Sequence, residues 1–279
     1  MKQMKTNKII IGILAIITGI SSFAVWQNNQ VPLARAAATK TIGVAPGPYG
    51  EMAQDVIGPL LKKKGYIVKT KEFNDYVQPN KALNSGNIDA NLFQHTAYLK
   101  TFSKANHLHL TAIGKTPTLG MGIYSSKIKS LKSLKSGDTV ALANDPSNLA
   151  RSLQLLQANH LITLKANIDV AKASISDVAK NPKNLKFKTL DAAQLPTARN
   201  TVTISLIPGN YSWNAKIKPS SALALEKLSE DYKEVFVVRT KDKNSKFAKA
   251  VQSVLNSQAF KKAIQKSDFK DFEKPNNWK

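Results

Sequence analysis

The chain has 279 residues, 42% of them hydrophobic, and it contains no cysteine. This length supports one or two domains with sizeable cores, and the lack of cysteine excludes disulfides and thiolate metal sites. The formal net charge of +23 is typical of nucleic-acid binding, or of a surface adapted to an anionic cell envelope. Because the lysines are scattered and no nucleic-acid motif is present, the envelope interpretation is favoured.

Residues 1–36 are predicted to be a targeting segment rather than part of the fold. Three lysines within the first eight residues precede an uncharged apolar run over Ile9–Trp26, and Ala34-Arg35-Ala36 forms an A-x-A cleavage site. The apolar run is also about long enough to cross a bilayer as an uncleaved anchor. The sequence therefore predicts export, with the mature protein either released or held at the membrane by this segment.

The next part of the chain alternates between strand and helix patterns, which predicts a mostly parallel sheet. The predicted elements are a strand over Thr41–Ala45, a helix over Glu51–Leu61, a strand over Tyr66–Phe73, a short helix from Pro79 to Gly86 and a strand over Ile88–Leu92. Pro79 suits a first helical turn and Gly86 a left-handed cap. Asp89 is interpreted as a hydrogen-bonding residue in the turn before the last of these strands.

The remainder of the chain has the same mixed character. Strands are predicted over Leu108–Gly114, Gly120–Tyr124, Thr139–Ala143, Leu185–Leu190, Val202–Leu206 and Tyr232–Arg239, with helices after Asn148, after Ile175 up to Asn181-Pro182, over Phe247–Ser257 and over Gln258–Lys266. By itself, the pattern predicts an α/β fold with two sheets.

Aromatic and polar residues follow the strand that ends near Leu92. Phe93, Gln94, His95 and Tyr98 emerge at its C-terminal end, where open α/β sheets bind their ligands. Together with Tyr76, they could line an apolar slot with few polar anchors, which suits a thioether side chain. The alternative is that Phe93 and Tyr98 are core residues, and for Tyr98 the two interpretations are evenly matched.

The segment Asn144-Asp-Pro-Ser-Asn148-Leu-Ala-Arg151 resembles a capped helix with an anion site. Asn and Asp are good helix caps, helix N-terminal amides bind anions, and Arg151 adds a bidentate donor for a carboxylate. Taken alone, the motif is more typical of an ordinary capped helix with a solvated arginine. The nearby aromatic motif favours the binding interpretation.

Catalytic and metal motifs are lacking. The sequence has no G-x-S-x-G, P-loop or H-E-x-x-H motif, so we expect no enzyme activity and no cofactor. His107 and His109 would place both rings on one face of a strand, but a third ligand of the right type is missing, so no metal is expected.

Three blocks of this chain resemble the NlpA/MetQ family of substrate-binding lipoproteins, whose pattern is FNDYVxPNxAL, GxIDAN and FQHxxYL. The matching blocks are Phe73–Leu83, Gly86–Asn91 and Phe93–Leu99, and Asn144–Leu153 resembles the family's NDPTNxxRxL. The resemblance implies a bilobed periplasmic-binding-protein fold of the type II-like class, with two crossover strands. Lobe 1 would hold residues 40–122 and 225–279, and lobe 2 residues 123–224.

The resemblance also implies a function and a ligand site. The protein would capture L-methionine or a related amino acid outside the cytoplasmic membrane, as a monomer, and deliver it to an ABC permease driven by an ATPase. Arg151, Asn148 and the helix amides would hold the carboxylate, and Glu234 and Asn210 the amine. Tyr76, Phe93 and His95 would wall the side chain.

The chain departs from the family at three places. The lipobox cysteine is absent, Pro208 stands where the family often has asparagine, and Glu234 stands where methionine-type members carry asparagine. A buried carboxylate is costly unless it is paired, so Glu234 either binds the ligand's ammonium or marks a different ligand. Two alternatives therefore stay open: another ligand such as a dipeptide or a different amino acid, or a basic cell-envelope interaction protein without a solute.

Overall fold

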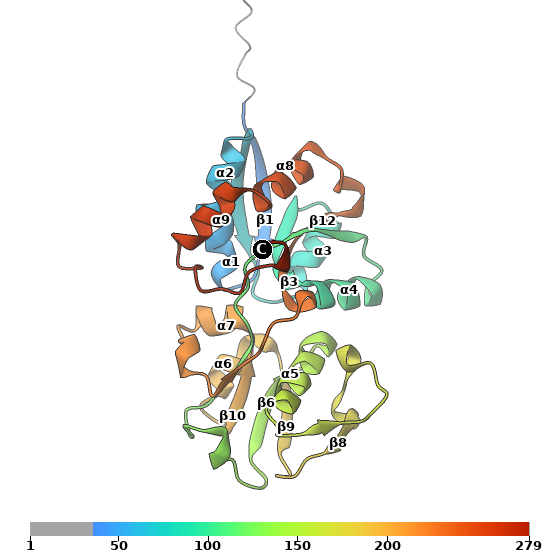
Figure 1. Ribbon diagram of the computed structural model, residues 1–279. Coiled ribbons are helices and arrows are strands. Elements are labelled where there is room, and N and C mark those ends of the chain that lie inside the picture. The colour runs from blue at the N-terminus through green and yellow to red at the C-terminus, as the bar shows by residue number, and fades with distance from the viewer. Residues whose placement is uncertain (1–35, 279) are drawn as a thin grey trace, which may run out of the picture. The chain divides into compact units, whose positions relative to one another are not determined.

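The computed structural model describes residues 36–278, which form one compact unit built around two five-stranded sheets. Figure 1 shows each sheet with its helices as a separate lobe, and two extended segments pass between the lobes. The predicted α/β fold with two lobes and two crossovers is confirmed. Residues 1–35, on which the predicted signal peptide or anchor falls, lie outside the described part.

The first sheet has the order β2-β1-β3-β12-β4. Its strands are β1 (Ala38–Val44), β2 (Tyr66–Glu72), β3 (Ala90–His95), β4 (Leu110–Lys115) and β12 (Glu234–Arg239). β1 pairs in parallel with β2 and β3, whereas β12 runs antiparallel between β3 and β4. Parallel pairing brings the C-terminal ends of β1 and β3 to one edge, which faces the second lobe.

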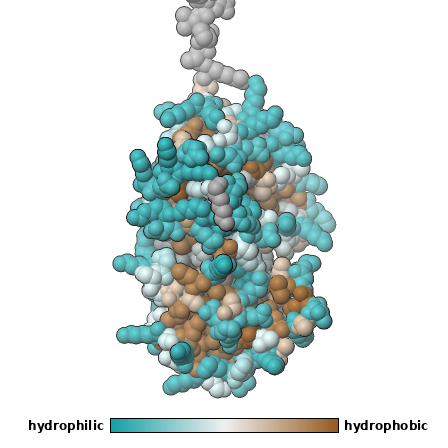
Figure 2. Space-filling model, viewed as in Figure 1, coloured by the Kyte–Doolittle hydropathy of each residue, from teal (hydrophilic) through white to brown (hydrophobic). Residues whose placement is uncertain are grey.

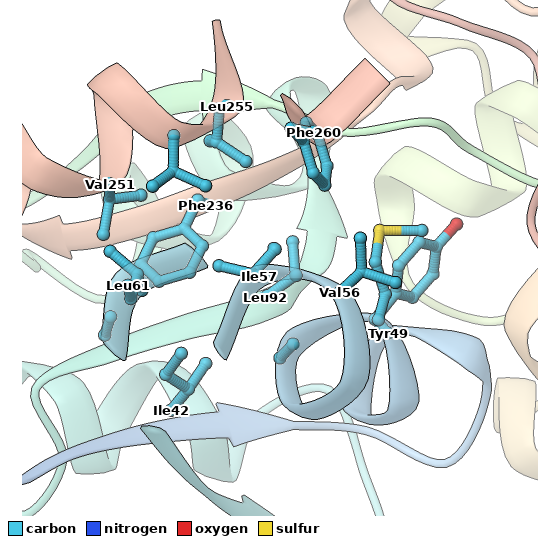
Figure 3. Packing of buried hydrophobic residues seen from close by; sticks show 14 of the residues in the cluster. Ile42, Tyr49, Val56, Ile57, Leu61, Leu92, Phe236, Val251, Leu255 and Phe260 are labelled. Atoms are coloured by element: carbon cyan, nitrogen blue, oxygen red, sulfur yellow. The ribbon is translucent and has the colours of Figure 1, made fainter. Parts of the chain in front are cut away.

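Helices cover both faces of the first sheet. They are α1 (Pro48–Glu51), a π-helical segment (Met52–Ile57), α2 (Gly58–Lys62), α3 (Gln78–Asn84), α4 (Thr96–Ala105), α8 (Lys246–Leu255) and α9 (Gln258–Gln265). The helix predicted from Glu51 begins earlier, because Pro48 fits a first helical turn. Figure 3 shows the core on one side of the sheet, where Ile57 and Leu61 from the first helical segment meet Phe236 of β12 and Leu255 of α8.

The second sheet has the order β11-β5-β10-β6-β9. Its strands are β5 (Gly122–Tyr124), β6 (Thr139–Ala143), β9 (Lys186–Leu190), β10 (Ile204–Ile207) and β11 (Ala224–Leu225). Its helices are α5 (Pro146–Ala158), α6 (Leu195–Ala198) and α7 (Gly209–Asn214). Leu142 of β6, Leu153 of α5 and Leu206 of β10 are fully buried in its main core.

Two local predictions were wrong. In place of the helix expected after Ile175, the 3₁₀ turn Ile175–Asp177, the second of two such turns, is followed by β8 (Val178–Lys180), which pairs with β7 (Thr163–Leu164). Ser174 and Asp177 close a capping box around the second turn, and Val178 then leaves it in an extended conformation. His107 has a left-handed φ of 54° and His109 precedes β4, so the two histidines do not share a strand.

The crossovers run between β4 and β5 and between β11 and β12, and the C-terminal segment holds both of them. Thr118 in the first crossover exchanges backbone hydrogen bonds with Glu273, at 3.0 Å in each direction. In the second, the buried Lys233 donates from Nζ to Glu273 Oε1 at 2.9 Å and to the Lys274 carbonyl at 2.7 Å. The two connections are therefore fixed to each other through one residue.

The surface is largely hydrophilic. Figure 2 shows hydrophilic side chains over most of the first lobe on the face drawn, with more hydrophobic surface on the second lobe. Within residues 36–278, no helix has both the length and the apolar character needed to cross a membrane.

Candidate functional site

One cavity lies where the two lobes meet, and it is nearly closed, with room of about 10 Å³, roughly that of one water molecule. The structure places all seven predicted site residues around it: Tyr76, Phe93, His95, Asn148, Arg151, Asn210 and Glu234. The other lining residues are Gln94, Tyr98, Leu119, Pro208 and Gly209.

A bulge at the end of β3 turns consecutive residues toward this cavity. In the pairing of β3 with β12, Gln94 faces Val235 but Leu92 faces Phe236, so Phe93 is the extra residue. Side chains of a regular strand alternate between its two faces, and a bulge breaks that alternation. Phe93, Gln94 and His95 consequently all line the cavity. The sequence pattern predicted that these residues emerge together, but not the bulge that turns them.

Three buried amide side chains hold the bulge in place. Asn80 of α3 donates to Gln94 Oε1 at 2.8 Å, and its own Oδ1 accepts from Asn91 at 2.9 Å and from Gln94 at 2.6 Å. Gln94 also donates to Asn91 Oδ1 at 3.0 Å. A buried polar network that is satisfied in this way rigidifies the backbone that carries it.

Aromatic rings form the apolar wall. Tyr76 lies 5.9 Å from Phe93, 5.6 Å from Tyr98 and 5.1 Å from Tyr211 between ring centroids. Tyr98 both packs in the core and lines the cavity, and its hydroxyl donates to the Tyr76 carbonyl at 3.0 Å. Tyr211 belongs to the second lobe, so the aromatic cluster spans both lobes; the sequence analysis did not assign it to the wall.

His95 connects the lobes as a neutral imidazole. It caps α4, where its Nδ1 accepts from the Tyr98 backbone N–H at 3.1 Å. The proton therefore lies on Nε2, which donates to Asn148 Oδ1 in the second lobe at 3.1 Å. Burial and the nearby Arg151 charge lower the pKa of His95 to about 3, so the ring is uncharged at neutral pH.

The N-terminus of α5 is capped by an acidic side chain. The N-cap Asp145 accepts from the Asn148 backbone N–H at 3.0 Å and from the Asn148 side-chain amide at 2.9 Å. The backbone and side-chain amides of Asn148 are therefore already engaged by the cap. Among the predicted carboxylate donors, Arg151 is the one with a free charge-bearing edge.

Arg151 is buried and paired with a residue that the sequence analysis missed. Its Nε donates to Glu226 Oε2 at 2.9 Å and its Nη2 donates to Glu226 Oε1. Tyr232 stacks on the guanidinium with 5.0 Å between Cζ and the ring centroid. Burial opposes the arginine charge, but Glu226 outweighs it and holds the pKa of Arg151 above its ordinary value.

Glu234 is a buried carboxyl group without a full set of partners. It begins β12 directly opposite His95, and its Oε2 is buried with no hydrogen-bond partner among residues 36–278. Burial raises the pKa of Glu234 to about 8; Arg151 acts against this rise and Glu226 adds to it. The cavity thus holds a carboxyl group whose ionised form a nearby cation would stabilise strongly.

Asn210 and Gly47 bring the lobes into close contact beside the cavity. Asn210 of α7 donates from Nδ2 to the Pro46 carbonyl at 3.0 Å and accepts from the Tyr76 hydroxyl at 2.6 Å. Gly47 has φ 139°, and a Cβ atom there would lie 2.7 Å from Asn210 Cβ. Only glycine fits this contact between the lobes.

Replacing Gly47 with alanine should therefore separate the lobes. We expect a loss of about 1–3 kcal/mol from backbone strain and the clash with Asn210, together with a larger radius of gyration in small-angle X-ray scattering. Gly50→Ala is the matched control, since Gly50 lies inside α1 and its added Cβ would meet only Val44 Cγ2 at 3.4 Å. Equal behaviour of the two variants would contradict the close contact at Gly47.

The cavity offers groups that complement a small zwitterion. A guanidinium with a free edge and an unpaired carboxyl group face one cavity, and aromatic rings close its remaining side. Both nitrogens of His95 are engaged in hydrogen bonds, so the ring is placed as a fixed donor.

Comparison with known proteins gives the same picture. The family model described as NlpA lipoprotein matches residues 41–277. A D-methionine-binding lipoprotein MetQ of Salmonella typhi is 39% identical over 76% of this chain and 80% of its own length. The methionine-binding lipoprotein MetQ of Bacillus subtilis is 34% identical over 93% of this chain and 96% of its own.

Solved structures agree with the fold. A nutrient binding protein from Burkholderia cenocepacia bound to methionine superimposes with a TM-score of 0.78 at 42% identity, covering 83% of this chain and 97% of that one. A methionine-binding lipoprotein from Bacillus subtilis gives 0.79 at 33% identity, over 84% and 96%. Although it has no cysteine to carry a lipid, the chain shares this sequence and architecture over nearly all its described length, and it belongs to the NlpA lipoprotein family.

Proposed function

We propose that this protein is the extracytoplasmic solute-binding component of an ABC importer and that it captures an amino acid, with L-methionine as the leading ligand. The observation that carries the proposal is the inter-lobe cavity in which the Arg151 guanidinium and the unpaired Glu234 carboxyl group lie beside an aromatic wall. Relatives named as D-methionine-binding and methionine-binding lipoproteins, and a similar protein whose structure contains bound methionine, support it.

Each part of an amino acid has a counterpart in the cavity. The free edge of Arg151 would hold the carboxylate through charge-assisted hydrogen bonds. Asn148, whose side-chain amide already donates to Asp145, would lie beside it. Glu234 and the Asn210 carbonyl would accept from the ammonium. Tyr76, Phe93 and His95 would wall the side chain, and aromatic surroundings favour a thioether.

Capture would work by closure of the lobes. Arg151, Asn148 and Asn210 belong to the second lobe, whereas Glu234, His95 and Tyr76 belong to the first. A ligand that contacts both groups binds the closed state more tightly and shifts the population toward it. The closed protein would then dock on a permease in the membrane, whose ATPase supplies the energy.

The remaining features are part of the same proposal. The protein would act as a monomer outside the cytoplasmic membrane, held there by residues 1–36 if they are not cleaved or released if they are, and it would bind no nucleic acid. It would use no cofactor or metal and catalyse no reaction.

A different ligand in the same role is the second candidate. Pro208 and Glu234 both line the cavity at places where the family pattern has asparagine. A thermal-shift panel of L-methionine, D-methionine, other amino acids and methionine-containing dipeptides separates the candidates, because a ligand that binds only the folded state raises its melting temperature.

Calorimetric titration of L-methionine into residues 37–279 tests the proposal directly. We expect binding with a dissociation constant in the micromolar range or tighter, since two charge-assisted contacts and a buried side chain contribute. The protein must first be shown to be folded and free of co-purified ligand. Absence of heat from methionine, with a shift from another panel member, would transfer the role to that ligand.

A further inference from the structure

Glu226 is the partner of Arg151, yet it does not line the ligand cavity. Its carboxylate binds the Nε and Nη2 edge of the guanidinium, and the two side chains are only 3% and 8% exposed. A bidentate pair of this kind fixes the plane of the guanidinium as well as its position. Arg151 Nη1 has no hydrogen bond to any residue between 36 and 278.

The same carboxylate also binds the crossovers between the lobes. Glu226 follows β11 at the start of the second crossover, and its backbone N–H donates to the Met121 carbonyl at 3.0 Å. Met121 at the end of the first crossover donates its N–H to Glu226 Oε1. Gly120 leaves room for the side chain, since a Cβ there would lie 3.2 Å from Glu226 Cγ.

The far side of the guanidinium is closed by Tyr232. Its ring stacks on Arg151, and Gln154 of α5 donates to its hydroxyl at 2.8 Å. Glu226 occupies the Nε and Nη2 edge of the guanidinium, and Tyr232 covers one of its faces. The Nη1 side therefore remains available to the cavity that Arg151 lines.

Glu234 makes this restraint necessary. It is the other carboxyl group that acts on Arg151, and its Oε2 has no partner within residues 36–278. Without Glu226, the guanidinium would be free to turn toward Glu234. If Arg151 and Glu234 paired with each other, Arg151 could no longer donate to the ligand's carboxylate and Glu234 could no longer accept from its ammonium.

We propose that Glu226 is a positioning residue for ligand recognition: it holds Arg151 away from Glu234, keeps one edge of the guanidinium directed at the ligand's carboxylate, and ties this edge to both crossovers. The inference rests on the proposed amino-acid function and adds to it a residue outside the cavity. It assigns Glu226 an effect that depends on whether the ligand carries a carboxylate.

The test compares L-methionine with L-methioninamide, which keeps the ammonium and the side chain but has no carboxylate. Calorimetry on the wild-type protein should show at least about tenfold tighter binding of methionine, from the charge-assisted contacts with Arg151. In Glu226→Gln, the methionine affinity should fall about tenfold or more, and the preference for methionine over methioninamide should nearly disappear. Glu230→Gln is the matched control, because Glu230 lies in the same crossover but pairs with Lys115 at 2.7 Å on the surface.

Gly120→Ala is a second, milder variant if Glu226→Gln does not fold. Its added methyl group would press on the Glu226 side chain by a few tenths of an ångström, and methionine affinity should fall more than methioninamide affinity. A variant that loses affinity for both ligands equally, or keeps the wild-type preference, would overturn the positioning role. A wild-type protein without any preference would instead overturn the proposed carboxylate site on Arg151, and the role of Glu226 with it.

Discussion

Replacing Arg151 with methionine should abolish methionine binding and destabilise the ligand-free protein by about 3–5 kcal/mol. The loss of stability follows because Glu226 is 8% exposed and would keep a buried charge without its partner. The loss of binding follows because Arg151 is the one lining residue with a permanent positive charge. Urea denaturation and calorimetry measure the two effects separately.

The double variant Arg151→Met with Glu226→Gln separates stability from binding. Glutamine removes the buried charge and keeps an oxygen for the Met121 N–H, which Glu226 accepts now. Most of the lost stability should return, since a buried pair replaced by neutral side chains is often tolerated, while methionine binding should stay absent. Recovery of binding in the double variant would exclude Arg151 as the carboxylate donor.

Replacing Glu234 with glutamine should change how the stability of the ligand-free protein depends on pH. The pKa of Glu234 is about 8 in the folded protein against 4.5 for an ordinary glutamate, so between these values the folded state binds more protons than the unfolded state. Stability contributed by this group therefore falls as pH rises through that window. His95 acts in the opposite direction, because its pKa is lowered from 6.5 to about 3 and stability rises with pH between those values.

The two groups can be separated because His95 is present in both proteins, so its contribution cancels in the difference between their stability curves. From pH 6.5 to 8 the wild-type protein should lose about 2 kcal/mol that Glu234→Gln does not lose, at about 1.4 kcal/mol per pH unit. The glutamine variant should also bind methionine about 10- to 100-fold more weakly, since the ammonium loses a charged acceptor. Parallel stability curves for the two proteins, or an unchanged affinity, would remove Glu234 as the amine anchor.

Binding and protonation at Glu234 are coupled in this scheme. An ammonium beside the carboxylate favours its ionised form, so at pH 7 methionine should displace the proton that Glu234 holds. Calorimetry in two buffers of different ionisation enthalpy measures the number of protons released. The number should approach one in the wild-type protein and zero in Glu234→Gln.

Much of the fold was predictable because periodic patterns are local. Thr139–Ala143 reads as a buried strand and forms β6 with the same bounds, and Pro79 and Gly86 mark the ends of α3 as their backbone preferences require. The prediction for the segment after Ile175 was wrong for the opposite reason. Its local pattern is weak, and pairing with β7 determined its structure.

Site residues that belong to sequence motifs could be predicted. Contacts between residues far apart in the sequence could not. All seven predicted residues line one cavity, although their roles toward a ligand stay predictions. Glu226 is 75 residues from Arg151 along the chain, and nothing in its neighbourhood marks it as a partner. The bulge at Phe93 depends on pairing with β12, and Tyr211 reaches Tyr76 only once the lobes meet.

The last strand of the first sheet is synthesised long after its neighbours. β12 lies between β3 and β4, so both of those strands expose an unpaired edge until Arg239 has left the ribosome, on the order of ten seconds after β4 at ordinary elongation rates. The second sheet draws on an unbroken stretch from β5 to β11 and can be completed earlier. A chain truncated before Glu234 would thus carry one complete lobe and one incomplete, aggregation-prone sheet. Pairing of β12 with β3 and β4 is therefore the last step in completing the first sheet.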